Sequence, residues 1–291
     1  MECIFCKSIN KEIPSKIVYE DDVVIGILDI YPATLGHILL IPKEHKPNFS
    51  ELDEKIVNHL GIIASRLSLL LVTNLKAQGI SLVIKEGVLG GQRSSHTLMH
   101  IIPRFENDSL NFDLLGGEEQ KGKQTKTNKL YEDKEIIVVE YPTLTEGHIA
   151  ILPKEEFSII MKVPEIIIGK MFLLAQKFVK KIVSGEENNN NNNRKRGANI
   201  VLNTGIDQPQ QTVSLHVIPR EEGDDFDFVW DVRQVDDKSL DEIVDKFKGN
   251  VKKGVEEQIE ERRDNKKEEQ EEEGNKDSEK NYYNSYLDRL P

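Results

Sequence analysis

The residues best suited to chemistry are histidines and one serine that alternate along two short apolar segments. In the first segment His96 and His100 flank Leu98, and in the second Ser214 is followed by His216. Alternate residues of a β-strand point to one face, so each segment would present these side chains together. Leu98 has neither a lone pair nor an ionisable group. A serine acts as a nucleophile only beside a positioned base, and no histidine precedes Ser214 in its segment.

The two cysteines, Cys3 and Cys6, are separated by two residues near the start of the chain. Two cysteines provide no disulfide framework, so the sequence favours a reduced, intracellular setting. A lone pair with this spacing is a weak indication of a metal site, because reduced cysteines often pack simply as small apolar residues.

The chain has 291 residues and a formal net charge of −12, with 51 acidic against 39 basic residues. This acidity disfavours a nucleic-acid binder, which needs a basic face against phosphates. A basic triplet, Arg194-Lys195-Arg196, follows the asparagine run Asn188–Asn193, and a solvated loop explains it better than nucleic-acid contact. The N-terminus lacks a signal-peptide pattern and charges interrupt the apolar stretches, so we expect a cytoplasmic protein without membrane spans.

Three motifs recur in the same order at a nearly constant spacing. Tyr19-Glu20-Asp21 recurs as Tyr131-Glu132-Asp133, Gly36-His37-Ile38 as Gly147-His148-Ile149, and His100-x-Ile102-Pro103-Arg104 as His216-x-Ile218-Pro219-Arg220. Ordered matches of this kind are hard to obtain by chance, so we infer two copies of one unit. We place the copies at residues 1–115 and 129–235, with a polar linker at 116–128. An acidic tail, partly helical or disordered, occupies residues 236–291.

Each copy is expected to fold as an antiparallel sheet with one main helix, which is an α+β architecture. Strands are expected in the first copy at 17–19, 23–29, 37–41, 80–84 and 98–103, and in the second near 136–140, 148–152, 198–203 and 213–218. Apolar residues of helical period run from Ile56 to Leu75 and from Ile167 to Ile182. A shorter apolar stripe from Leu240 to Phe247 predicts an amphipathic helix in the tail.

Several segments together resemble the signature of the histidine triad (HIT) superfamily. They are Asp29-x-x-Pro32, Gly36-His37, Pro42-Lys43-x-His45, and Gly90-Gly91-Gln92 followed by His96-x-Leu98-x-His100-Ile101-Ile102-Pro103-Arg104. The resemblance covers roughly residues 1–110 and 129–225, and the second copy depends on the repeat for its match. It implies a small α+β unit that pairs into a ten-stranded sheet. A covalent tandem could form that pair within one chain, so we expect an intramolecular pseudo-dimer and a monomeric protein.

The resemblance also implies chemistry at the α-phosphate of a nucleotide. In the family the middle histidine of the triad attacks phosphorus and forms a nucleotidyl-histidine intermediate. The middle positions here are Leu98 and Ser214, and the first position of the second copy is Thr212. Loss of a nucleophile lowers turnover by a factor of about 10⁴ to 10⁶. We therefore expect that neither copy performs the usual reaction.

Nucleotide-binding groups are better preserved than the nucleophile. Asp29 matches the ribose-binding carboxylate, and Gln92 and His100 match contacts on the phosphate side. Lys85 stands where the family usually has asparagine, and it could pair with a phosphate as a point charge. In the second copy the candidates are Asn203 and His216, with Glu140 as a loose replacement for the carboxylate. The competing interpretation is that His100 and His216 are hydrogen-bonded structural histidines.

Some family members bind Zn²⁺ with a cysteine pair and two histidines. The matching residues are Cys3, Cys6, His45 and His96, a closed set of two thiolates and two imidazoles that is typical of a structural zinc site. The alternative is that the cysteines pack in a core while His45 is solvated. The second copy has Glu156 in place of His45 and no cysteine, so we expect no zinc there.

The leading functional prediction is a nucleotide-binding protein that takes a purine nucleotide or a related phosphate ligand. The enzymatic alternative is a nucleotide phosphohydrolase or transferase that uses a displaced residue such as His100 or Ser214. A third hypothesis is an interaction scaffold whose acidic tail contacts a basic protein partner. The sequence leaves all three open.

Overall fold

The computed structural model describes residues 3–110, 112, 114, 128–141, 144–184, 197–206, 208, 211–224 and 228–248. The chain divides into two compact units, Met1–Val244 and Asp245–Pro291. Both predicted copies fall in the first unit, and their boundaries stay predictions. Almost the whole linker, the asparagine run with its basic triplet, and the tail beyond residue 248 lie outside the described residues.

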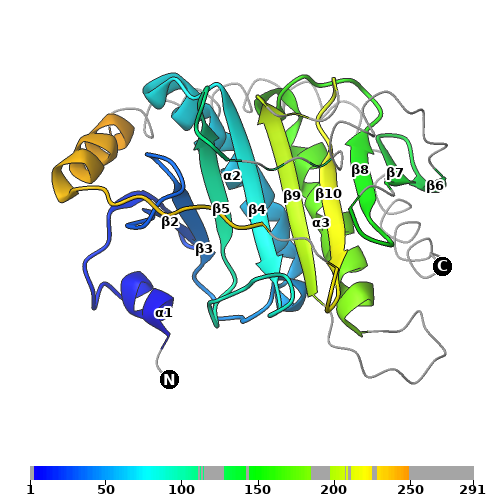
Figure 1. Cartoon of the computed structure of the whole chain (residues 1–291), viewed down its shortest axis with the longest axis horizontal. Helices are drawn as coiled ribbons and strands as arrows, with labels where there is room; N and C mark the ends of the chain where they lie inside the picture. Colours follow the sequence, from blue (N-terminus) through cyan, green and yellow to red (C-terminus); the bar gives the residue numbers. More distant parts are fainter. Residues whose placement is uncertain are drawn as a thin grey trace, which may run out of the picture. The chain divides into compact units, whose positions relative to one another are not determined.

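The two copies contain the same succession of strands and one long helix (Figure 1). The first copy consists of α1 (Ile4–Ile9), β1 (Ile17–Glu20), β2 (Val24–Leu28), β3 (Ile38–Pro42), a short 3₁₀ turn η1 (Phe49–Glu51), α2 (Glu54–Leu75), β4 (Gly79–Glu86) and β5 (Met99–Arg104). The second consists of β6 (Lys129–Glu132), β7 (Ile136–Glu140), β8 (Ile149–Pro153), η2 (Ile160–Lys162), α3 (Glu165–Ser184), β9 (Gly197–Gly205) and β10 (Leu215–Arg220).

All ten strands form one antiparallel sheet in the order β1-β2-β3-β5-β4-β9-β10-β8-β7-β6. The order of the first copy is thus mirrored by the order of the second. The copies meet at the centre, where β4 pairs with β9 from Gly79–Gly205 to Glu86–Ala198. This arrangement confirms the predicted α+β class.

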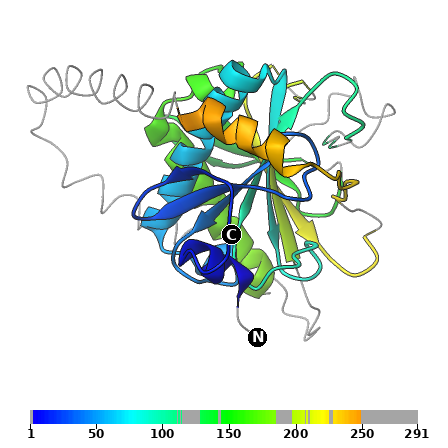
Figure 2. The same cartoon turned by 90° about the vertical axis from the view of Figure 1, so that its left-hand side faces the viewer.

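The long helices α2 and α3 pack on each other and cover one face of the sheet (Figure 2). α2 begins after Asp53, whose carboxylate accepts a hydrogen bond of 2.8 Å from the N–H of Lys55. It ends where Lys76 adopts a left-handed conformation with φ of 59°. Its buried residues recur at helical spacing and face the sheet and α3; they are Val57, Leu60, Gly61, Ile63, Ala64, Ser65, Leu67, Ser68 and Leu71.

α2 differs from the expectation that no segment approaches the character of a membrane span. The helix is 22 residues long and contains a window with a mean hydropathy of 1.6, enough by length and composition to cross a membrane. Half of that window is buried inside the protein. Its apolar side is therefore accounted for by packing against the sheet and α3.

Neither α1 nor β6 was anticipated, and most strand boundaries differ by one or two residues. α1 is only six residues long, and β6 is a four-residue edge strand with two exposed residues, so neither carries a strong apolar pattern. β5 starts at Met99 and β10 at Leu215, each later than expected. Leu98 and Ser214 thus lie one residue before their strands.

Residues 228–236 are extended and cross the face of the sheet opposite the helices (Figure 1). This C-terminal crossing segment lies at the end of the second copy in sequence but packs against the first. The backbone N–H of Arg233 donates to the carbonyl of Pro32 at 2.9 Å. Residues 237–248 then form the helix predicted in the tail, and Lys16 pairs with Asp241 at 2.6 Å.

Candidate functional site

The four predicted zinc ligands come together beside α1. The sulphur of Cys6 lies 3.2 Å from Nδ1 of His45 and 3.7 Å from Nδ1 of His96. The sulphur of Cys3 lies 3.5 Å from Nδ1 of His96, and the two Nδ1 atoms are 3.2 Å apart. All four ligand atoms lie within 4.8 Å of one another. The cysteines are half-buried and directed at the histidines, unlike a pair packed in a core, whereas His45 is exposed, as the alternative expected.

These distances fit a tetrahedral ion. Zn²⁺ at about 2.3 Å from sulphur and about 2.0 Å from nitrogen needs ligand atoms roughly 3.3–3.8 Å apart. His96 is also oriented for this role, because its Nε2 lies 2.9 Å from the carbonyl oxygen of Pro42. Donation from Nε2–H to that carbonyl leaves Nδ1 as the free ligand atom, an arrangement common around protein-bound metals.

A histidine pair, with His37 fully buried and His100 half-buried, lies on the opposite face from the helices in the first copy. Nε2 of His37 is 3.0 Å from Nδ1 of His100. The N–H of Ala33 donates to Nδ1 of His37 at 3.2 Å, so this nitrogen has no proton of its own. The proton of His37 is therefore on Nε2 and is donated to His100, which carries its proton on Nε2. His100 thus offers a hydrogen-bond donor, not a base.

Both histidines are neutral at physiological pH. Burial, together with the nearby positive charge of Lys85, lowers the pKa of His37 to about 3. Burial, His37 and Lys85 also hold the pKa of His100 well below its usual value. A neutral His100 can donate to a phosphate oxygen, but the positive charge at this site is that of Lys85.

Asp29 and Lys85 lie on either side of the histidine pair. Asp29 follows β2, accepts from the N–H of Tyr31 at 2.9 Å, and has a carboxylate oxygen 3.5 Å from Nδ1 of His37. Its side chain is 18% exposed, and burial raises its pKa. The ammonium group of Lys85 donates to the carbonyl of Phe228 at 2.6 Å.

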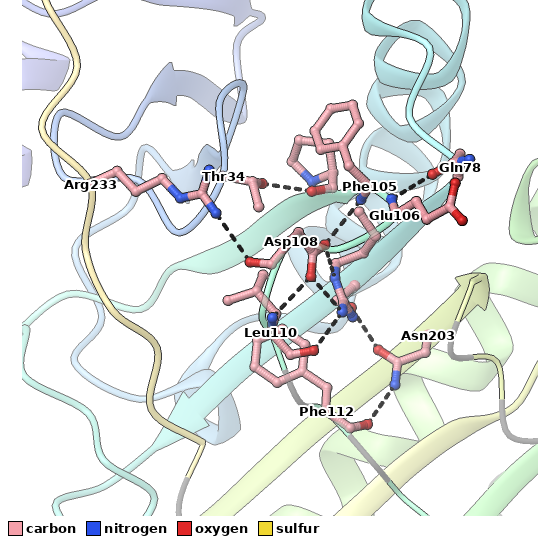
Figure 3. Close-up of polar contacts among 12 residues, drawn as sticks. Thr34, Gln78, Phe105, Glu106, Asp108, Leu110, Phe112, Asn203 and Arg233 are labelled. Atoms are coloured by element: carbon pink, nitrogen blue, oxygen red, sulfur yellow. Dashed lines mark hydrogen bonds and ion pairs between the residues drawn. The ribbon is translucent and has the colours of Figure 1, made fainter.

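The aromatic residue at this site, Trp230, is supplied by the C-terminal crossing segment. Its ring centroid is 5.0 Å from that of His100 and 5.9 Å from that of His37, and the Lys85 ammonium lies 4.2 Å above it. Arg233 fixes the segment further along, donating from Nη2 to the carbonyl of Asp108 at 3.1 Å (Figure 3). Sequence reasoning missed Trp230, and the only signal was that it is the sole tryptophan of the chain.

Leu98, at the nucleophile position, belongs to an apolar cluster. It packs with Phe5 and Ile9 of α1 against the side chains of β2 and β3, which include Ile27 and Leu39. The position that would carry a reactive imidazole therefore contributes to the same apolar cluster as the N-terminal helix.

Two other predicted binding residues already have protein partners. The side-chain amide of Gln92 accepts from the N–H of Gly87 at 2.8 Å and donates to the carbonyls of Pro47 and Ser94. These hydrogen bonds stabilise the loop that contains Gln92. Asn203 on β9 is fully buried, and its polar contacts can be followed in Figure 3. It accepts from Ser81 at 2.7 Å and donates to the carbonyl of Phe112 at 2.9 Å.

The corresponding pair in the second copy is closed to solvent. Nε2 of His148 is 3.0 Å from Nδ1 of His216, whose Nε2 lies 2.8 Å from the hydroxyl of Ser214. All three residues are fully buried. Burial lowers the pKa of His216 to about 3. The structure thus places the imidazole of His216 beside Ser214, as the alternation of the segment predicted, but Ser214 has no exposed surface.

Tyr141, not Glu140, takes the place of the first copy's carboxylate. Its N–H donates to the carbonyl of His148 at 2.7 Å, as that of Asp29 does to His37 at 2.9 Å. The Tyr141 ring lies against the second histidine pair, with centroids 5.2 Å from His148 and 4.9 Å from His216. The carboxylate of Glu140 instead accepts from the side chain of Asn128. The one-residue error arose because the repeat motifs do not fix the loop between them.

Residues 10–107 match the HIT domain family. The chain is 43% identical over 113 residues to an uncharacterized HIT-like protein of Borreliella burgdorferi, a match that covers 38% of this chain and 81% of the relative. This chain belongs to the HIT family. The HIT protein is also 42% identical over 107 residues to an uncharacterized HIT-like protein of Methanocaldococcus jannaschii, covering 36% of the chain and 81% of the relative. It is 39% identical over 112 residues to adenylylsulfatase HINT3 of Arabidopsis thaliana, covering 38% of the chain and 55% of that enzyme.

Two solved structures match different lengths of the chain. A galt-like protein of Arabidopsis thaliana matches with a TM-score of 0.57 and 16% identity, over 76% of this HIT protein and 82% of that chain. This likeness concerns the fold alone, and its coverage extends beyond a single copy. A Zn-bound histidine triad family protein of Mycobacterium smegmatis matches at 33% identity over 38% of this chain and 81% of that one, with a TM-score of 0.37.

Proposed function

We propose that this HIT protein binds a nucleoside monophosphate unit in its first copy without forming a nucleotidyl-histidine intermediate. The observation that carries the proposal is the contrast between Leu98 and His100. Leu98 is built into an apolar cluster, while His100 keeps an oriented donor beside the charge of Lys85. Binding groups are present and the nucleophile is absent.

Each polar group has a distinct part in the proposed complex. The carboxylate of Asp29 would accept hydrogen bonds from ribose hydroxyls, since the oxygen 3.5 Å from His37 faces an Nδ1 that has no proton to donate to it. His100 would donate from Nε2 to a phosphate oxygen, and Lys85 would exchange its bond to the carbonyl of Phe228 for a phosphate. Trp230 supplies an aromatic face beside them.

We assign structural roles to the remaining predicted binding residues. Gln92 holds the loop before β5, Asn203 joins the two copies, and His216 belongs to a buried network with Ser214 and His148. We therefore place a single nucleotide site in the first copy. The two copies within one sheet are interpreted as the intramolecular counterpart of a two-fold pair, which supports the monomeric state.

We also propose a structural Zn²⁺ at Cys3, Cys6, His45 and His96. When bound, the ion supplies a tetrahedral cross-link and leaves no position for substrate. The cross-link would hold α1 to His45 in the loop after β3 and to His96 just before β5. Since Phe5 and Ile9 of α1 pack against the same apolar cluster as Leu98, zinc would help to keep that cluster in place.

The sole tryptophan lies at the proposed site, so its fluorescence can report binding directly. Titration of the full chain with AMP and with GMP should change the emission of Trp230 in a saturable manner, with one ligand per chain by calorimetry. Asp29→Asn should weaken binding about tenfold or more, because it removes the charged acceptor for ribose. Ser214→Ala, a change in the second copy, is the matched control and should bind as the parent does. No saturation at millimolar nucleotide would refute the proposal.

One observation favours a second function, catalysis by Ser214. Its hydroxyl is within hydrogen-bond distance of His216, as a serine nucleophile requires. Its complete burial opposes this role, because a substrate could not reach it. Hydrolysis of an adenosine phosphoramidate that Ser214→Ala abolishes would establish the enzymatic function and displace the binding one.

A further inference from the structure

The crossing of α2 and α3 contains two residue pairs of very unequal size. Gly61 faces the ring of Phe172 so closely that a Cβ on Gly61 would lie 2.6 Å from ring atom Cδ2. Gly169 faces Asn58, and a Cβ on Gly169 would overlap the amide oxygen of Asn58. Each pair therefore consists of one filled position against one empty position.

Contacts around the crossing show which residues correspond between the copies. Arg66 pairs with Glu165 at 2.7 Å, and the same contact with the copies exchanged is Lys177 with Glu54 at 3.9 Å. Likewise Ser65 donates to the carbonyl of Ile160 at 3.3 Å, while Gln176 donates to that of Phe49 at 3.1 Å. In each case a residue of the first copy and its counterpart in the second copy differ in residue number by the same amount.

The same shift makes Gly61 the counterpart of Phe172 and Asn58 the counterpart of Gly169. Both pairs consequently straddle the local two-fold axis, where a residue meets its own counterpart. In a pair of identical halves these positions would necessarily hold identical residues. Here each position holds a large residue in one copy and glycine in the other.

We propose that this interface fits only an unlike half and rejects pairing between two like halves. Two first copies would place Asn58 against Asn58, where the structure has room for one amide opposite glycine. Two second copies would place Phe172 against Phe172 in a space that holds one ring. Close-packed interiors do not absorb such additions without displacement of the backbone.

The central strands do not carry this restriction. Ser81 on β4 faces Asn203 on β9, and the counterpart pair is Lys85 facing Asn199. Ser81 accepts from the buried guanidinium of Arg104 at 3.2 Å, and Asn199 accepts from that of Arg220 at 2.7 Å. Lys85 therefore already lies opposite a residue bound to a buried guanidinium, so the selection of an unlike half rests on the helix crossing.

The partner that this surface selects is thus the complementary half of the same kind of chain. Because that half is covalently attached, the central strands and both long helices are occupied within one molecule. The two copies are then free to diverge in their sites, as Asp29 and Tyr141 have done, without losing their pairing. This inference does not depend on whether the first copy binds a nucleotide.

The first experiment separates the halves after folding. A protease site is inserted in the segment 116–127 of the full chain, and the purified protein is cut, unfolded in urea and refolded. Native mass spectrometry should then show one-to-one pairs of unlike halves with the mass of the uncut chain. Pairs of two first halves or two second halves, at a level comparable with unlike pairs, would overturn the proposal.

The second experiment uses the uncut chain and exchanges the filled and empty positions. Gly61→Phe alone and Phe172→Gly alone should each lower the Tm by about 10 °C, from overpacking and from a cavity respectively. The double variant should recover most of this loss, because the ring re-enters the same space from the other helix. Exchange of the off-axis pair by Arg66→Lys with Lys177→Arg is the control and should change the Tm little. Additive losses in the Gly61 and Phe172 double variant would contradict complementarity.

Discussion

Nε2 of His37 lies 3.0 Å from Nδ1 of His100, with both rings on the face of the sheet opposite the helices. The same atoms of His148 and His216 are also 3.0 Å apart. In the first copy the N–H of Ala33 sets the direction of this hydrogen bond. The pairs have thus kept a common geometry while the residues around them diverged.

The buried histidines should make stability sensitive to acid. The folded-state pKa of His216 is lowered to about 3, below the ordinary value of 6.5, so the unfolded chain binds more protons between these limits. Stability is then fully present above about pH 6.5 and is lost as the pH falls toward 3. Thermal unfolding between pH 7 and pH 4 should show a shallower dependence for His216→Asn than for the parent. Equal slopes would mean that His216 is not held neutral by the fold.

A histidine restored at position 98 should bring back covalent chemistry. Leu98→His would place an imidazole beside the oriented donor of His100 and the charge of Lys85, the other groups that handle phosphate. Hydrolysis of adenosine 5′-phosphoramidate should rise at least about tenfold over the parent, far short of the roughly 10⁴ to 10⁶ that a nucleophile contributes in an optimised site. Leu98→Asn, polar but not nucleophilic, is the control, and equal rates for the two variants would contradict the assignment of the position.

Removal of zinc should destabilise the first copy selectively. Elemental analysis of the purified chain should give one zinc per molecule, and Cys6→Ser should reduce both this content and the Tm, the latter by about 10 °C. Lys7→Ala, the neighbouring position on α1, is the control and should retain the metal. A parent protein that has no zinc when purified from zinc-supplemented medium would argue against the site.

Two homologous ion pairs should differ in their contribution to stability. Arg104–Asp108 is 2% and 4% exposed, and the counterpart Arg220–Asp224 is 5% and 15% exposed. Asp108→Asn leaves a buried guanidinium without its counter-charge and should cost about 3 kcal/mol of unfolding free energy. Asp224→Asn is the matched variant and should cost clearly less, since solvent reaches its pair more easily. Chemical denaturation of both variants measures the difference, and equal losses would refute this account.

Local patterns were sufficient for much of the fold and for the four candidate zinc ligands. Alternating and helical periodicities located most strands and both long helices, because these patterns reflect backbone geometry within a few residues. The repeat of Gly36-His37 and His100-x-Ile102-Pro103-Arg104 identified the second copy. Cys3, Cys6, His45 and His96 were found by motif, and the structure brought them together. The absence of a nucleophile at Leu98 was also a property of the sequence alone.

Tertiary structure decided which of the matched residues are engaged by the protein itself. Gln92 and Asn203 match binding positions, yet their amides are engaged by the loop and by the junction of the copies. Trp230 reaches the first copy's histidines from the end of the second copy, and Gly61 meets Phe172 across the helix crossing. Such contacts join residues more than a hundred positions apart. They depend on how whole elements pack, which the periodicity of a single segment does not specify.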